Sequence, residues 1–238
     1  PASAQRVAGH GKASRGVARM VTRSGRADLD HLLLQSPLHE TADELCAVAK
    51  ELKVSSSNIL LGAKATEATI KRMSKEGQLA NYRILHFATH GAVAGEISGT
   101  TEAGLILPPP KEQSDDDDGY LTASEVAGLK LDADWVILSA CNTAAGSTQD
   151  AEALSGLARA FFYAGARALL VSHWAVDSAA TVNLITRAVR TINADKRLGR
   201  AQALQRAMLA MVDGGATWQR HPAFWAPFVV VGEGASSR

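Results

Sequence analysis

Apolar residues along this chain fall into two patterns. Short runs in which nearly every position is apolar predict strands buried on both faces of a sheet. Longer stretches with apolar residues three and four positions apart predict amphipathic helices. Strands that alternate with helices predict an α/β fold with a mostly parallel sheet and helices on both faces. The predicted strands are NILLG (58–62), YRILHFATHG (82–91), WVILSAC (135–141), RALLVSHW (167–174) and FWAPFVVVG (224–232), and the main helices cover about 40–53, 65–77, 150–165, 177–193 and 199–213.

Composition agrees with one folded unit and argues against several classes of protein. The 238 residues suffice for one sizeable domain, and 46% hydrophobic with 21% charged residues argues against a disordered chain. A net charge of +1 provides no overall field for nucleic acid or an anionic membrane. No apolar run is long enough to span a bilayer, and no secretory signal is visible. We therefore expect no nucleic-acid partner and no membrane partner.

Two segments depart from the alternating pattern. The stretch before residue 28 contains six basic residues and no acidic one, so residues 1–35 are predicted to be a basic N-terminal arm or linker and residues 36–238 the folded domain. Residues 108–119 combine three prolines with four consecutive aspartates. Such residues neither join a strand ladder nor bury without cost, so this segment is predicted to be a mobile surface loop.

The acidic segment leaves calcium binding open as an alternative function. SDDDDGYLTASE (114–125) matches an EF-hand loop from its third position to Glu125, with Ser114 in place of the first aspartate. However, LPPPKEQ precedes it where the entering helix should be, and Thr122 and Glu125 have the spacing of a helix capping box. We therefore favour the cap, and calorimetry with calcium distinguishes the two.

The two cysteines lie in different sequence surroundings. Cys46 stands in a helical stretch and is predicted to be a small buried hydrophobe. Cys141 ends a buried strand, and the carboxyl ends of parallel strands face the crevice where ligands bind. The absence of a CxxC pair or a disulfide framework suits a reducing compartment, so we expect a cytoplasmic protein. Because it lies at such a strand end, Cys141 is the candidate nucleophile.

A thiol needs a base or a positive neighbour to become a nucleophilic thiolate. His90 ends one predicted buried strand as Cys141 ends another, so the two side chains emerge at one edge if these strands are parallel neighbours. His173 also stands at a strand end and remains a rival base. The N–H groups of Gly91 and Cys141 are the candidate oxyanion hole.

The pair His86 and His90 also has the H-x-x-x-H spacing of a helical zinc site. No glutamate follows His86, and the apolar run places both residues on a strand, so no metal site is expected. His86 is instead predicted to be a core histidine with a hydrogen-bond partner.

Candidate substrate-binding residues follow the strand RALLVSHW, which should lie beside the cysteine strand and end at the same edge. Ser172, Trp174 and Asp177 are candidates for a substrate-binding pocket beside Cys141. Trp174 would supply an apolar wall, and Asp177 would pair with a basic group, preferably arginine. Asp177 is equally well placed to cap the helix that follows it.

Five segments occur in a specific order: YRILHFATHG, DGYLTASEVAGLKL, WVILSACNTA, LSGLARAFFYAGARALLVSHWAVD and HPAFWAPFVVVG. Together they resemble the CHAT domain, the caspase-like domain often found after tetratricopeptide repeats in bacterial proteins. The resemblance covers about residue 36 to the C-terminus. It implies a caspase-like, mostly parallel sheet with helices on both faces, and a His–Cys dyad carried by His90 and Cys141.

The expected function is therefore that of a cysteine endopeptidase, a hydrolase that cleaves a protein or peptide substrate. This chemistry needs no metal and no organic cofactor. The resemblance also implies that the chain is the C-terminal effector of a larger protein, regulated by a repeat region or an activating protein. The alternative is a catalytically silent CHAT domain that acts as a regulated protein-interaction module.

Overall fold

The computed structural model describes residues 20–23, 26–27, 32, 38–93, 97–98, 102–114, 116–139, 156–174 and 176–235. The central element is a four-stranded sheet with the order β10-β9-β8-β3. Its strands are β3 (Ile84–Phe87), β8 (Trp135–Leu138), β9 (Ala168–Ser172) and β10 (Phe228–Gly232). Strands β3, β8 and β9 are parallel, and β10 runs antiparallel to β9 at one edge. The predicted mostly parallel α/β sheet is confirmed.

Two small sheets accompany the central one. Strands β4 (His90–Ala92), β6 (Gly104–Ile106) and β7 (Tyr120–Thr122) form an antiparallel sheet with the order β4-β6-β7. Strand β1 (Met20–Arg23) lies between β2 (Arg26–Ala27) and β5 (Ile97–Ser98). The first of these sheets contains His90, the candidate base.

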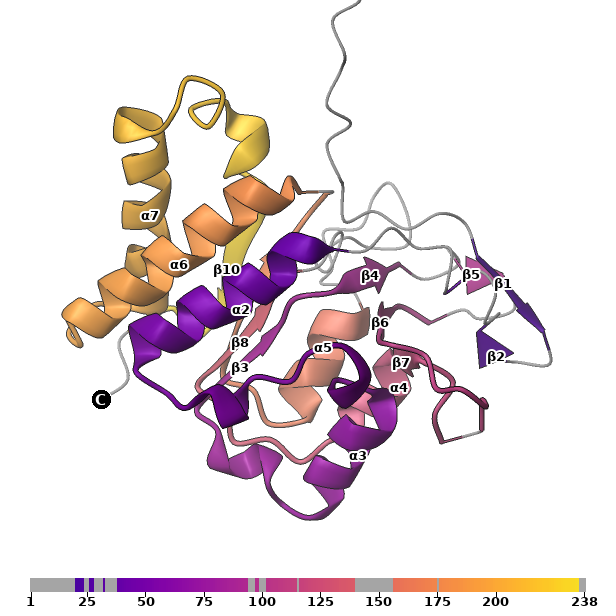
Figure 1. Ribbon diagram of the computed structural model, residues 1–238. Coiled ribbons are helices and arrows are strands. Elements are labelled where there is room, and N and C mark those ends of the chain that lie inside the picture. Colours follow the sequence, from indigo (N-terminus) through magenta and orange to yellow (C-terminus); the bar gives the residue numbers. More distant parts are fainter. Residues whose placement is uncertain are drawn as a thin grey trace, which may run out of the picture.

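Helices cover both faces of the central sheet (Figure 1). They are α2 (His39–Leu52), α3 (Glu67–Lys75), α4 (Ala123–Ala127), α5 (Gly156–Tyr163), α6 (Ser178–Ala194) and α7 (Arg200–Gly214). Short 3₁₀ turns occupy Ser56–Asn58, Gly62–Lys64, Leu79–Asn81 and Pro222–Phe224. Among the described helices, none combines the length and apolar character that crossing a membrane requires.

Strand β8 divides its side chains between two hydrophobic cores. Trp135 and Ile137 pack with residues of α2, α6 and α7, whereas Val136 and Leu138 pack with residues of α3, α4 and α5. Successive side chains of a strand point to opposite faces of a sheet, so a strand with helices on both faces must be apolar throughout. All four residues are buried, as the continuous apolar run predicts.

Part of the basic N-terminal stretch contributes to a third buried cluster. Ala27 and Leu32 are buried there with Ala92, Ile106 and Tyr120. Strand β1 of the same stretch pairs with β5. The domain boundary after residue 35 stays a prediction, but these two apolar side chains pack with the domain.

Three sequence-based expectations are wrong. Residues 59–61 of NILLG form no strand; Ile59 and Leu61 are extended but belong to no sheet. The run YRILHFATHG is not one strand but two, β3 and β4, in different sheets. Cys46 is exposed rather than buried, because it lies on the outer side of α2, away from buried Val48 and Ala49.

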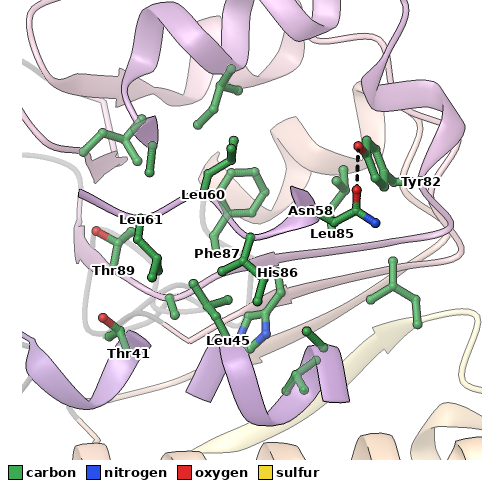
Figure 2. Close-up of a pocket in the computed structure, with 18 of the residues that line it drawn as sticks. Thr41, Leu45, Asn58, Leu60, Leu61, Tyr82, Leu85, His86, Phe87 and Thr89 are labelled. Atoms are coloured by element: carbon green, nitrogen blue, oxygen red, sulfur yellow. Dashed lines mark hydrogen bonds between the residues drawn. The ribbon is translucent and has the colours of Figure 1, made fainter. Parts of the chain in front are cut away.

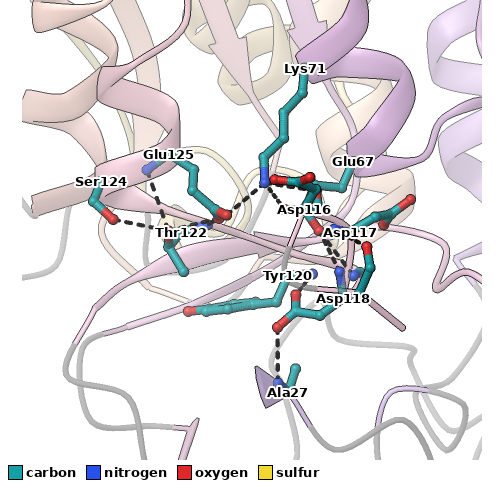
Figure 3. Close-up of polar contacts among 12 residues, drawn as sticks. Ala27, Glu67, Lys71, Asp116, Asp117, Asp118, Tyr120, Thr122, Ser124 and Glu125 are labelled. Carbon is teal, nitrogen blue, oxygen red and sulfur yellow. Dashed lines mark hydrogen bonds and ion pairs between the residues drawn. The ribbon is translucent and has the colours of Figure 1, made fainter. Parts of the chain in front are cut away.

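The described part of the acidic loop is anchored by specific hydrogen bonds (Figure 3). The Glu67 carboxylate accepts the backbone N–H groups of Asp118 and Gly119, each at 3.0 Å. The Asp118 carboxylate in turn accepts the N–H groups of Ala27 at 3.1 Å and Tyr120 at 2.9 Å. These hydrogen bonds hold the backbone at Asp118, Gly119 and Tyr120 in place. The expectation of a mobile loop did not include them.

Candidate active site

His90 lies just beyond the carboxyl end of β3. Strand β3 ends at Phe87, and His90 opens β4 three residues later, opposite Ile106 of β6. The Thr89 hydroxyl donates a hydrogen bond to the Ile106 carbonyl, which fixes the backbone directly before His90. The His90 side chain is buried, with 7% of the residue exposed. Gly91 is also buried and lies opposite Leu105.

The position of His90 corrects one detail of the sequence analysis. His90 was expected to end the strand that neighbours the cysteine strand, but it begins a strand of the second sheet. The parallel ladder between β3 and β8 ends at Phe87 and Leu138, after which β6 supplies the backbone partners for His90. A single apolar run therefore serves two sheets, and periodicity alone does not reveal the break.

Cys141 lies outside the residues that the structure describes, so its position relative to His90 is not described either. The described chain reaches Ser139, two positions before it. The Ser139 N–H donates to the Phe87 carbonyl at 2.9 Å, so β8 stays against β3 for one residue beyond the strand. The neighbouring carboxyl ends of β3 and β8 thus lead toward His90 and Cys141, respectively.

A buried polar cluster joins this edge of the sheet to helix α2. His86 Nε2 lies 2.7 Å from Oε1 of Glu44 and 2.9 Å from Oγ of Ser139, and the Ser139 hydroxyl also donates to Oε1 of Glu44. Glu44 and Ser139 are fully buried. The prediction that His86 is a core histidine with a hydrogen-bond partner is confirmed. Sequence reasoning missed Glu44 and Ser139, because their contacts join residues 42 to 95 positions apart.

A cavity of about 750 Å³ runs along β3 (Figure 2). His90 is among the residues that line it. Every residue from position 81 to 90 lines it, as do Leu45 of α2 and Leu60 and Leu61. Strand β3 is the edge strand of the central sheet, so its backbone has a strand partner on one side only among the described residues. The volume is in the range of ligand-binding cavities, which span roughly 300 to 1,000 Å³.

The strand after β8 in the sheet is β9, as predicted for RALLVSHW. Ser172 is its last residue and is fully buried opposite Phe228 of β10. His173 follows it with an exposed side chain, and its backbone N–H donates to the Pro227 carbonyl at 2.9 Å. Trp174 is 44% exposed beyond the same strand end. None of these positions by itself decides between His90 and His173 as the base.

Asp177 caps helix α6. Its carboxylate accepts the N–H of Ala180 at 3.0 Å, the bond expected of an N-cap residue. The capping alternative of the sequence analysis is therefore confirmed, and a role of Asp177 in substrate specificity stays a prediction.

The structure gives Glu125 two partners that argue against a calcium loop. Thr122 and Glu125 form the predicted capping box at the start of α4. The Lys71 ammonium lies 2.7 Å from Glu125 and supplies the positive charge that a bound cation would otherwise provide (Figure 3). Burial alone would raise the pKa of Glu125, but hydrogen bonds from Lys71 and Thr122 lower it below its usual value.

Comparison with known proteins identifies the family of this chain. A search of curated proteins found no match. The family model of the CHAT domain matches residues 2–233, which is nearly the whole chain. The matched range holds both candidate dyad residues and the central sheet with helices on both faces. The chain belongs to the CHAT domain family, whose fold is caspase-like.

Proposed function

We propose that this CHAT domain is a cysteine endopeptidase with His90 as the base and Cys141 as the nucleophile. One observation carries the proposal. Strands β3 and β8 are parallel neighbours and stay hydrogen-bonded at their carboxyl ends, through Phe87 and Ser139 respectively. From there the chain continues to His90 after β3 and to Cys141 after β8. Reactive groups at the carboxyl ends of adjacent parallel strands are in the usual position for an active site of an open α/β sheet.

In this mechanism His90 takes the proton of the Cys141 thiol. The thiolate attacks the scissile carbonyl, and the N–H groups of Gly91 and Cys141 hold the oxyanion. Protonated His90 then gives its proton to the leaving amine, which leaves the acyl group on sulfur as a thioester. Water, deprotonated by His90, attacks the thioester, and protonated His90 returns the proton to the departing Cys141 sulfur. This releases the free thiol and the carboxylic acid product, which loses its proton to the solvent.

The substrate is a protein or peptide, and we assign Trp174 and Asp177 to its binding region, whereas Ser172, which precedes them, is fully buried. Strand β9, which ends at Ser172, lies beside β8, so these residues follow the carboxyl end of the adjacent strand. Exposed Trp174 supplies apolar surface, and the Asp177 carboxylate would pair with a basic side chain before the scissile bond.

The second candidate function is a regulated, catalytically silent interaction module. The burial of His90 supports it, because only 7% of the residue is exposed to solvent. A regulatory repeat region or an activating protein that opens the site would reconcile this burial with catalysis.

The test compares wild type with Cys141→Ala and His90→Ala, using an electrophilic peptide probe and a screen of proteome cleavage products. The peptidase predicts labelling and cleavage in wild type and loss of both in each variant. His173→Ala is the matched control, because His173 is the rival base at the next strand end. Loss in His173→Ala with retention in His90→Ala would reverse the base assignment. Labelling and cleavage identical in wild type and Cys141→Ala would overturn the peptidase and favour the interaction module.

A further inference from the structure

Three polar side chains from three elements meet beneath the candidate active site. Glu44 comes from α2, His86 from β3, and Ser139 follows the last residue of β8. A buried carboxylate is costly unless donors surround it, and Glu44 accepts hydrogen bonds from both other residues. Burying these polar groups costs free energy, and they lie at the end of the strand that leads to Cys141. A specific role for them is therefore expected.

The arrangement is not a serine-hydrolase triad. In such a triad the acid binds one ring nitrogen of the histidine and the serine binds the other. Here Glu44 and Ser139 both contact Nε2 of His86, whereas Nδ1 is buried without a hydrogen-bond partner among the described residues. Ser139 is also fully buried, out of reach of a substrate.

The geometry is that of a clamp on Ser139. Its backbone N–H is bound to Phe87 of β3, and its hydroxyl is bound to Glu44 of α2. His86 donates through Nε2, because a carboxylate only accepts, and thereby holds the same Glu44 oxygen. Both the backbone and the side chain of Ser139 are therefore fixed, two residues before Cys141.

We propose that Glu44, His86 and Ser139 are positioning residues that orient Cys141 toward His90. This inference rests on the proposed function of the Cys141–His90 pair. Helix α2 is thereby part of the active-site framework, although sequence reasoning placed no functional residue on it. A small misplacement of a reacting group lowers the rate by as much as about a hundredfold.

The test measures the alkylation rate of Cys141 by iodoacetamide as a function of pH, in a Cys46→Ser background. The chain has two cysteines and Cys46 is exposed, so this background leaves one thiol to follow. Wild type should show a thiolate inflection well below the ordinary thiol value of about 8.5. Ser139→Ala, Glu44→Gln and His86→Leu should move the inflection upward and lower the rate at neutral pH about tenfold or more.

Two features of this experiment distinguish a positioning effect on Cys141 from an electrostatic effect or a loss of stability. Removing the Glu44 charge would, through electrostatics alone, favour the thiolate and lower the inflection, the opposite of the expected shift. His86→Gln keeps a donor near the place of Nε2 and should restore the wild-type profile that His86→Leu loses. Matched controls are Glu67→Gln, another buried carboxylate, and Ser74→Ala, another buried serine hydroxyl, which accepts the Lys130 N–H. Both should lower the melting temperature and leave the inflection unchanged.

The outcomes distinguish the two proposals. The first outcome is a lowered thiolate inflection in wild type that is lost in His90→Ala but kept in Ser139→Ala and His86→Leu. This outcome overturns the positioning role alone. A wild-type inflection at the ordinary thiol value, unchanged in His90→Ala, overturns the proposed dyad and the positioning role with it. Equal shifts in His86→Gln and His86→Leu would also contradict the clamp.

Discussion

The Lys71 ammonium joins helix α3, the acidic loop and helix α4. It lies 2.6 Å from Glu67, 2.7 Å from Glu125 and 2.9 Å from the Asp116 carbonyl. Glu67 is almost fully buried, and burial raises its pKa more than the hydrogen bond from Lys71 lowers it. A buried carboxylate thus depends on one partly exposed cation.

Lys71→Met should lower the free energy of unfolding by about 2 to 3 kcal/mol at neutral pH, because Glu67 loses its cation. The sign with pH follows from the raised pKa of Glu67. Without Lys71 the pKa of Glu67 rises further. The loss of unfolding free energy is therefore greatest at a pH above this raised pKa, and it fades as the pH falls toward 4.5, the usual value for a glutamate. Urea unfolding at several pH values measures both effects.

Lys75→Met is the control for this prediction. Lys75 is exposed near the end of the same helix, so its replacement should change stability by less than about 0.5 kcal/mol. A Lys71→Met loss that grows as the pH falls would contradict the assignment of the effect to Glu67.

Helix α6 begins with a cap that was also a specificity candidate. Asp177→Ala should lower the free energy of unfolding by about 1 kcal/mol, because the N–H of Ala180 loses its acceptor. Thermal or urea unfolding measures this change. Cleavage of peptides with arginine, leucine or aspartate before the scissile bond measures the second role. An arginine preference that survives Asp177→Ala would leave the residue with the cap alone.

The turn between α5 and β9 depends on one glycine. Gly165 has a φ of 109°, and a Cβ at this position would collide with the carbonyl oxygen of Leu131. Gly165→Ala should therefore lower the free energy of unfolding by about 2 to 4 kcal/mol. Gly214→Ala is the control, since a Cβ there meets no other atom within 4 Å and alanine favours a helix. Equal effects of the two substitutions in urea unfolding would contradict this reading.

Sequence predicted those elements whose pattern is local. The apolar runs of β8, β9 and β10, the cap at Thr122 and the helix stop at Gly165 all depend on neighbouring residues, and the structure confirms each. The break between β3 and β4 was missed because both halves of that run are apolar and differ only in their strand partners.

The candidate site was predicted in part, for the same physical reason. His90 and Gly91 were predicted from the end of an apolar run, and the structure places them three and four residues beyond β3, at the start of β4 in a second sheet. Glu44 was missed, because a glutamate within an amphipathic helix looks solvent-exposed until its partners on β3 and β8 are known. Cys141 stays a prediction from the sequence and the family.

At the scale of the whole molecule, the two hydrophobic cores share the central sheet. Ile137 and Leu138 are adjacent and fully buried, but they pack in opposite cores. Ile137→Ala and Leu138→Ala should each lower the free energy of unfolding by about 3 kcal/mol, because each leaves a cavity. Tryptophan fluorescence and far-ultraviolet circular dichroism should report one common transition for each variant, since β8 joins the cores.

Leu209→Ala is the control for this prediction, because Leu209 is an exposed residue of α7 and should have little effect. Separate fluorescence and circular dichroism midpoints in Ile137→Ala or Leu138→Ala would show that the two faces of the sheet unfold independently.

The order of strands across the central sheet has a consequence for synthesis on the ribosome. From β3 through β8 and β9 to β10, spatial order follows chain order, so each new strand finds its partner already made. Domains fold as the chain emerges, at about 5 to 20 residues per second. The sheet can therefore grow strand by strand toward β10, and the Ser139 clamp can close before β9 and β10 have left the exit tunnel.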